Sequence, residues 1–104
     1  MKRSAAHLQV IVITGASDGI GAELAVQLAA RHRSSLALVL AARNEERLQM
    51  VARTCKRYGS ACLIVRTNVA SESECKHLIR SAVEQFGGID ILINNAGRTA
   101  QASF

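Results

Sequence analysis

A glycine-rich turn between two apolar segments holds the residues best suited to bind a phosphate group. The turn reads Thr14-Gly15-Ala16-Ser17-Asp18-Gly19-Ile20-Gly21. Glycine lets the chain turn tightly and lets a ligand approach the backbone, and the N–H groups at the start of a helix attract an anion. The glycine spacing differs from the G-x-G-x-x-G dinucleotide pattern. The turn predicts anion binding, with a ligand-free turn that only packs a helix onto a strand as the alternative.

The end of the second apolar segment, Ala41-Ala42-Arg43-Asn44, carries a base. In nucleotide-binding sheets an acid at this point accepts the ribose hydroxyls of NAD, whereas a nearby arginine accommodates the 2′-phosphate of NADP. The nearest acids, Glu45 and Glu46, already belong to the following helix, and the planar guanidinium of Arg43 suits a phosphate. Alone, Arg43 would be interpreted as a solvated surface residue. Together with the glycine turn, it favours NADP(H) over NAD(H).

The remaining reactive residue types form no second site. The spacing of the cysteines matches no metal pattern, and we expect small buried thiols in a reducing cytosol. The three histidines are widely spaced, and we assign them no role and predict no metal site. The residues concerned are Cys55, Cys62, Cys75, His7, His32 and His77.

Strand and helix patterns alternate along the chain. Short apolar runs predict strands at residues 8–14, 36–42, 61–67 and 89–93, and amphipathic periodicity predicts helices at residues 19–32, 45–58 and 71–86. The inward residues expected on the three helices are Ile20, Leu24 and Leu28, then Leu48, Val51, Ala52 and Cys55, and finally Cys75, Leu78, Ile79, Ala82, Val83 and Phe86. Ser71 and Glu74 have the form of a capping box, and Gly59 and Gly87 fall where helices stop.

This alternation predicts an α/β fold with a doubly wound, Rossmann-like parallel sheet. Strands that alternate with helices pair in parallel through right-handed crossovers, which gives four strands in the order 3-2-1-4 with three helices. We expect residues 1–104 to form one unit, the N-terminal dinucleotide-binding part of a single domain that is cut short. The fourth strand would then be an exposed edge, and such edges invite pairing or aggregation.

Composition narrows the classes of function. The 104 residues are 49% hydrophobic, 20% charged and only 3% aromatic, with a net charge of +5. The basic charge is scattered through predicted helices and few aromatic side chains could stack on bases, which argues against a nucleic-acid binder. No apolar run approaches the roughly 18 residues of a membrane span. We expect a cytoplasmic protein without a nucleic-acid or membrane partner.

The chain resembles the short-chain dehydrogenase/reductase family over essentially its whole length. The resemblance rests on the turn at residues 14–21, on Asn94-Asn95-Ala96-Gly97 after the fourth strand, and on Asp90 before it. It implies that the chain is the Rossmann half that binds a dinucleotide. The cofactor-binding residues that follow are Gly15, Ser17, Asp18, Gly19, Ile20, Gly21, Arg43, Asn44, Asn68, Val69, Asn95, Ala96 and Gly97.

Several of these residues carry particular expectations from the resemblance. Asn68-Val69 stands where the family usually has Asp-Val beside the adenine, and an amide oxygen can still accept from an adenine amino group. Asn95 is expected mainly to hold the central strands together. Asp18 opposes the NADP(H) assignment, because many NADP-preferring relatives have a basic residue at this position.

The family transfers hydride between nicotinamide and a carbonyl or alcohol carbon, using a serine and a Tyr-x-x-x-Lys pair. The only tyrosine, Tyr58, is followed four residues later by Cys62, so we assign no catalytic residue and expect a helix-end packing role for Tyr58. The chain alone is expected to be inactive, with a small substrate and a possible oligomer in a full-length form. Two alternatives stay open: a non-enzymatic nucleotide-binding module and the product of a decaying gene.

Overall fold

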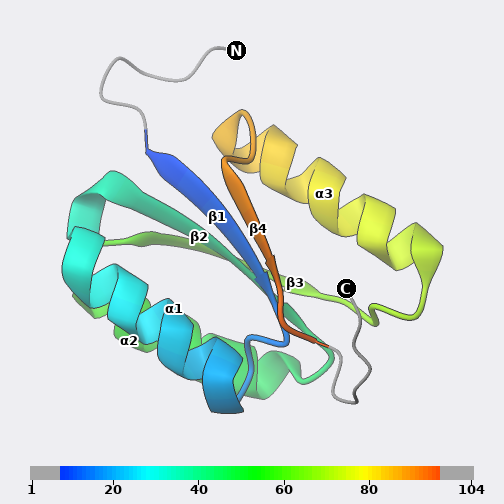
Figure 1. Ribbon diagram of the computed structural model, residues 1–104, viewed down its shortest axis with the longest axis horizontal. Helices are drawn as coiled ribbons and strands as arrows, with labels where there is room; N and C mark the ends of the chain where they lie inside the picture. Colours follow the sequence, from blue (N-terminus) through cyan, green and yellow to red (C-terminus); the bar gives the residue numbers. More distant parts are fainter. Residues whose placement is uncertain (1–7, 97–104) are drawn as a thin grey trace.

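The computed structural model describes residues 8–96, which fold as a parallel sheet covered by helices on both faces (Figure 1). The sheet has four strands in the order β3-β2-β1-β4, which confirms the predicted fold class. Three α-helices and one 3₁₀ turn connect the strands within these residues. The elements are β1 (Gln9–Thr14), α1 (Gly19–His32), η1 (Arg33–Ser35), β2 (Leu36–Ala42), α2 (Glu45–Arg57), β3 (Ala61–Arg66), α3 (Glu72–Phe86) and β4 (Ile91–Asn94).

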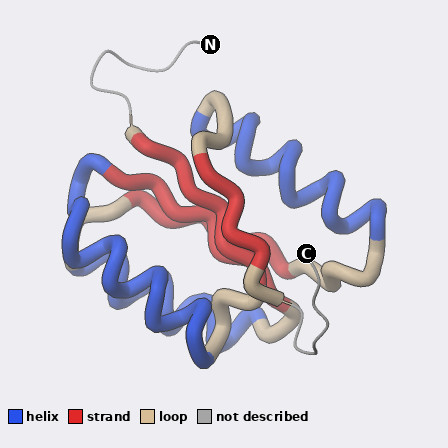
Figure 2. The backbone as a smooth tube through the Cα atoms, in the orientation of Figure 1, coloured by secondary structure: helices blue, strands red, loops and turns tan. Residues whose placement is uncertain are grey.

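Alternate residues of the central strands build two separate cores. Ile11 and Ile13 of β1 face α1 and α2, whereas Val10 and Val12 face α3. Every residue of β2 is buried, as expected for a strand covered on both faces. Figure 2 shows the strands in the middle layer, with α3 on one side and the other two helices on the opposite side. The apolar, β-branched strands thus determine a three-layer arrangement.

The apolar face predicted for α1 was wrong at Ile20 and is not the most buried face of the helix. Ile20 is 77% exposed, and the buried positions are Gly21, Ala25 and Ala29. Leu24 and Leu28 are only partly buried at the edge of the core. Small side chains let α1 pack close to the sheet. The face that carries them is therefore the buried one, although the larger apolar side chains lie elsewhere on the helix.

The inward faces predicted for the other two helices are confirmed at their buried residues, with two exceptions on α3. On α2, Leu48, Ala52 and Cys55 are buried as expected. On α3, Leu78 and Ala82 are buried, but Ile79 and Val83 are exposed. Only part of the apolar face of α3 therefore packs against the sheet within residues 8–96.

The fourth strand begins two residues later than predicted. The Asp90 carboxylate accepts a hydrogen bond from the backbone N–H of Val10 at 2.7 Å, and the Asp90 N–H donates to the Val10 carbonyl oxygen at 2.9 Å. A side chain thus takes the place of the backbone acceptor at this point, and the regular β1–β4 pairing starts at Ile91. Within the described residues β4 is an edge strand, with Leu92 52% exposed.

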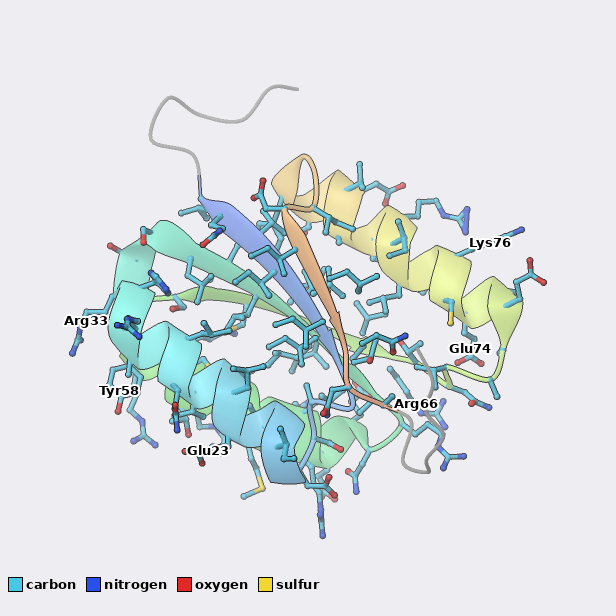
Figure 3. The ribbon with its side chains drawn as sticks, viewed as in Figure 1. Glu23, Arg33, Tyr58, Arg66, Glu74 and Lys76 are labelled. Carbon is cyan, nitrogen blue, oxygen red and sulfur yellow. The ribbon has the colours of Figure 1, made fainter. Side chains whose placement is uncertain are left out.

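Tyr58 follows α2 as its C-cap, with the Arg33 guanidinium 5.3 Å from the centre of its ring. This confirms a packing role at a helix end. Figure 3 shows Tyr58 and Arg33 at the opposite end of the sheet from Arg66, the last residue of β3. Among residues 8–96, no helix combines the length and apolar character needed to cross a bilayer.

Candidate functional site

An open groove of about 790 Å³ lies at the carboxyl ends of the strands. This is the edge at which doubly wound sheets bind ligands, and the volume falls in the range of small-molecule sites. Predicted residues from four separate segments meet there. They are Gly15, Ser17, Asp18, Gly19, Ile20, Arg43, Asn44, Asn68, Val69, Asn95 and Ala96.

One predicted site residue among residues 8–96 does not belong to this lining. Gly21 is buried in the first turn of α1, and Gly97 lies outside the described residues. Three lining residues were missed: Ala42, Thr67 and Ala70. Each of them adjoins a predicted site residue in the sequence, so its closeness to the end of a strand could have identified it.

The β1–α1 turn uses glycine for two different physical reasons. Gly15 and Gly19 have φ values of +65° and +58°, a region that costs other residues conformational energy. Gly21 is helical but crowded, because a Cβ there would lie 2.6 Å from Asn95 Nδ2 and would also overlap the carbonyl oxygen of Gly15. Gly21 therefore shapes the turn from behind instead of lining the groove.

The hydroxyl of Thr14 joins the ends of β1 and β4. It donates to Asn94 Oδ1 at 3.0 Å and accepts from the backbone N–H groups of Asn95 at 2.9 Å and Ala96 at 3.1 Å. The side-chain amide of Asn95 donates to the Gly15 carbonyl oxygen at 3.2 Å. This is the strand-joining geometry expected of Asn95, and Thr14 shares the task. The two motifs named in the sequence thus meet in one hydrogen-bonded network.

The amino end of α1 points into the groove without a side-chain cap. Asp18 is the N-cap residue, yet its carboxylate makes no capping hydrogen bond. It pairs instead with Arg47, whose Nη1 lies 3.1 Å from Asp18 Oδ2. The first N–H groups of a helix have no acceptor within the helix, so this end of α1 can offer its amides to an anion.

The end of β2 places a guanidinium at the groove. Arg43 is exposed and lines the groove beside Asn44, whose side chain accepts from Arg47 N at 3.0 Å and so caps α2. Arg66 Nε donates to the backbone carbonyl oxygen of Arg43 at 3.4 Å, so a second arginine lies close to the end of β2. The Arg43 guanidinium in the lining suits a phosphate group.

The loop after β3 forms the far wall of the groove. The Asn68 side-chain oxygen accepts from Ala70 N at 3.0 Å, while its backbone N–H donates to Glu74 Oε1 at 2.7 Å. The predicted capping box is therefore only half present: Ser71 Oγ accepts from Glu74 N at 3.2 Å, but Glu74 reaches back to Asn68. These bonds fix the loop that carries Val69, which is 41% exposed.

Two of the cysteines lie together in the core beneath α2, away from the groove. A hydrogen bond with Cys62, together with burial, raises the pKa of the Cys55 thiol well above its usual value. The hydrogen bond from Cys55 lowers the pKa of the Cys62 thiol. Cys55 is thus a protonated, buried thiol at neutral pH, as predicted for a small core residue. Cys62 and Cys75 are only partly buried, so the prediction of buried thiols is confirmed for Cys55 alone.

Comparison with known proteins points to one family. The model of a family described as short chain dehydrogenase matches residues 9–104. An 11-beta-hydroxysteroid dehydrogenase-like 4A protein of Arabidopsis thaliana is 42% identical over 97 residues, which cover 92% of this chain and 31% of the relative. The chain therefore spans about a third of the length of this curated relative.

Solved structures agree with the sequence comparison. A metagenomic short-chain oxidoreductase in complex with NADP superposes with a TM-score of 0.78 at 31% identity, over 89% of this chain and 41% of that one. An NADH-dependent reductase complexed with NAD gives a TM-score of 0.74 at 30% identity, over 88% and 37% of the two chains. Structural neighbours thus include complexes with both dinucleotides.

Proposed function

The chain belongs to the short-chain dehydrogenase family, and we propose that its groove binds NADP(H) in preference to NAD(H). It would serve as the cofactor-binding part of an oxidoreductase that transfers hydride between nicotinamide and a carbonyl or alcohol carbon. The observation that carries this proposal is the convergence of the glycine turn, the end of β2 and the Asn95 segment on one groove.

The residues of the groove suit the parts of a dinucleotide. The turn between Gly15 and Gly19, with the open amino end of α1 behind it, suits the pyrophosphate. Asn68 and Val69 would contact the adenine, and Asn95 and Ala96 the part of the cofactor nearer the nicotinamide. No ionic group other than Asp18 and Arg43 lines the groove among the described residues, and Asp18 is already paired with Arg47.

The preference for NADP(H) rests on Arg43. Its guanidinium stands at the end of β2 with no acid in the lining beside it at that strand end. An acid there would accept the ribose hydroxyls of NAD and repel a 2′-phosphate, whereas a guanidinium binds the phosphate. Arg66, which contacts the backbone carbonyl oxygen of Arg43, adds positive charge near the end of β2.

The bound cofactor would supply or accept the hydride, and the residues of this chain would bind and orient it. The only tyrosine, Tyr58, caps α2 beneath Arg33 at the other end of the sheet, where it cannot act as acid or base on a groove-bound substrate. We therefore expect this chain alone to bind the cofactor without turnover. The hydroxysteroid name of the Arabidopsis relative supports a carbonyl or alcohol substrate and nothing narrower.

Titration of the purified chain with NADPH and with NADH tests the proposal. Arg43→Gln should weaken NADPH binding about tenfold or more, because it removes charge-assisted hydrogen bonds, and should leave NADH binding nearly unchanged. Arg53→Gln, which alters an exposed arginine of α2 outside the groove, is the matched control. Equal affinity of the natural chain for both cofactors would refute the preference, and binding of neither would refute the proposed function.

A further inference from the structure

The amino end of α1 differs from those of the other two α-helices. Asn44 and Ser71 cap α2 and α3, and each side-chain oxygen accepts from a backbone N–H three residues on, at 3.0 and 3.2 Å. Asp18, an equally good capping residue, has extended backbone (φ −159°, ψ 179°) and caps nothing. Its carboxylate is turned away from the helix that it begins.

The partner that holds this carboxylate is Arg47. Arg47 lies in the first turn of α2, and its guanidinium crosses to Asp18 on the neighbouring turn. Both side chains are more than half exposed, so the ion pair adds little to the stability of the fold. Its effect on the position and charge of Asp18, a residue that lines the groove, is the larger consequence.

We propose that Arg47 is a positioning residue for the cofactor: it keeps the Asp18 carboxylate away from the first amides of α1 and leaves them to the pyrophosphate. A free Asp18 side chain would accept from the N–H of Ile20 or Gly21, the donors that an N-cap residue normally uses. It would also add a negative charge beside two phosphates. The inference rests on the proposed function, because it concerns the same groove.

The pairing also accounts for an acid at an unfavourable position. A carboxylate next to a bound phosphate lowers affinity by repulsion, and this effect falls with added salt. In this chain the guanidinium at 3.1 Å offsets that charge. An acid in the turn is therefore compatible with a bound dinucleotide as long as Arg47 is present.

The variant Arg47→Gln tests the inference, with Kd values for NADPH and NADH as the measurement. Release of Asp18 to compete as a cap should weaken both cofactors by a similar factor, about fivefold, because both carry the same pyrophosphate. The melting temperature should change by less than about 4 °C, since a lost exposed ion pair is offset by a gained cap. If Arg47 had only a structural role, replacing it would not weaken cofactor binding while the melting temperature stayed nearly constant.

A second substitution supplies the rescue. Asp18→Ala removes the competing carboxylate, so adding it to Arg47→Gln should recover most of the affinity for both cofactors that Arg47→Gln loses. Arg53→Gln, on the same helix but outside the groove, is the control and should change neither Kd. Absence of rescue, or a loss confined to NADPH, would overturn the inference, the latter because it would place Arg47 on the 2′-phosphate. Failure of the natural chain to bind either cofactor would instead refute the proposed function.

Discussion

Replacing Gly21 by alanine sets helix propensity against steric contact. Alanine in a helix is favoured over glycine by about 1 kcal/mol, so propensity alone predicts a more stable protein. The structure predicts the opposite sign. A Cβ at residue 21 would lie 2.6 Å from Asn95 Nδ2 and 2.9 Å from the Gly15 carbonyl carbon, and would overlap the oxygen of that carbonyl.

The cost can be worked from these contacts. The Gly15 carbonyl belongs to the backbone and accepts from Asn95 at 3.2 Å, so it cannot move without distorting the turn. Overpacking of this kind typically costs about 1–3 kcal/mol, and its upper end applies where backbone must shift. After the gain in propensity, we expect Gly21→Ala to lower the free energy of unfolding by about 2 kcal/mol, or roughly 10 °C in melting temperature.

Thermal denaturation followed by circular dichroism measures this change. In an Asn95→Ala background one of the two obstacles is gone, so Gly21→Ala should cost less there than in the natural chain. Binding of NADPH should also weaken, since the displaced Gly15 lines the groove. A variant as stable as the natural chain, or more stable, would refute the close approach of α1 to the turn.

Two further substitutions test the network at the strand ends and the buried thiol. Thr14→Val keeps the shape of the side chain but removes the hydroxyl that bonds Asn94, Asn95 and Ala96. It should lower the free energy of unfolding, measured by urea denaturation, by about 2 kcal/mol, whereas Thr14→Ser should lower it less. Equal losses in the two variants would contradict the hydrogen-bonding role. Because the pKa of the Cys55 thiol is raised, the folded chain keeps a proton that the unfolded chain releases, so stability falls as the pH rises past about 8.5. Cys55→Ala should flatten this fall while Cys75→Ala should not, and unchanged pH dependence in Cys55→Ala would contradict the raised pKa.

The architecture could be predicted because the signals for it are local. Uniformly apolar strands such as β2 need cover on both faces, and their alternation with amphipathic helices leaves parallel pairing as the consistent solution. The strand order and the bounds of α1 and β2 agree with the structure. The signals at the two ends of α3 also agree, since Ser71 caps its start through its side chain and Gly87 follows its last residue.

The location of the candidate site was predictable for a related reason. In a parallel sheet the carboxyl ends of all strands lie at one edge, so residues that follow different strands must approach one another. Gly15, Arg43, Asn68 and Asn95 do line one groove. Which dinucleotide they bind stays a prediction based on Arg43.

Pairings between distant segments depended on tertiary structure. The buried face of α1 is set by how near the helix lies to the sheet, so Gly21 is buried and the larger Ile20 is exposed. The contact of Asp18 with Arg47 joins residues 29 positions apart, and the start of β4 depends on a carboxylate of Asp90 that bonds Val10.

The sequence by itself thus determined the order of strands and helices and the edge at which the candidate site residues collect, because periodicity, capping and parallel pairing are local rules. Only the tertiary structure decided that Gly21 packs against the turn instead of lining the groove, and that Arg47 pairs with Asp18 at the start of α1. Those outcomes depend on distances of a few ångströms between segments remote in the chain, and no local pattern encodes such distances.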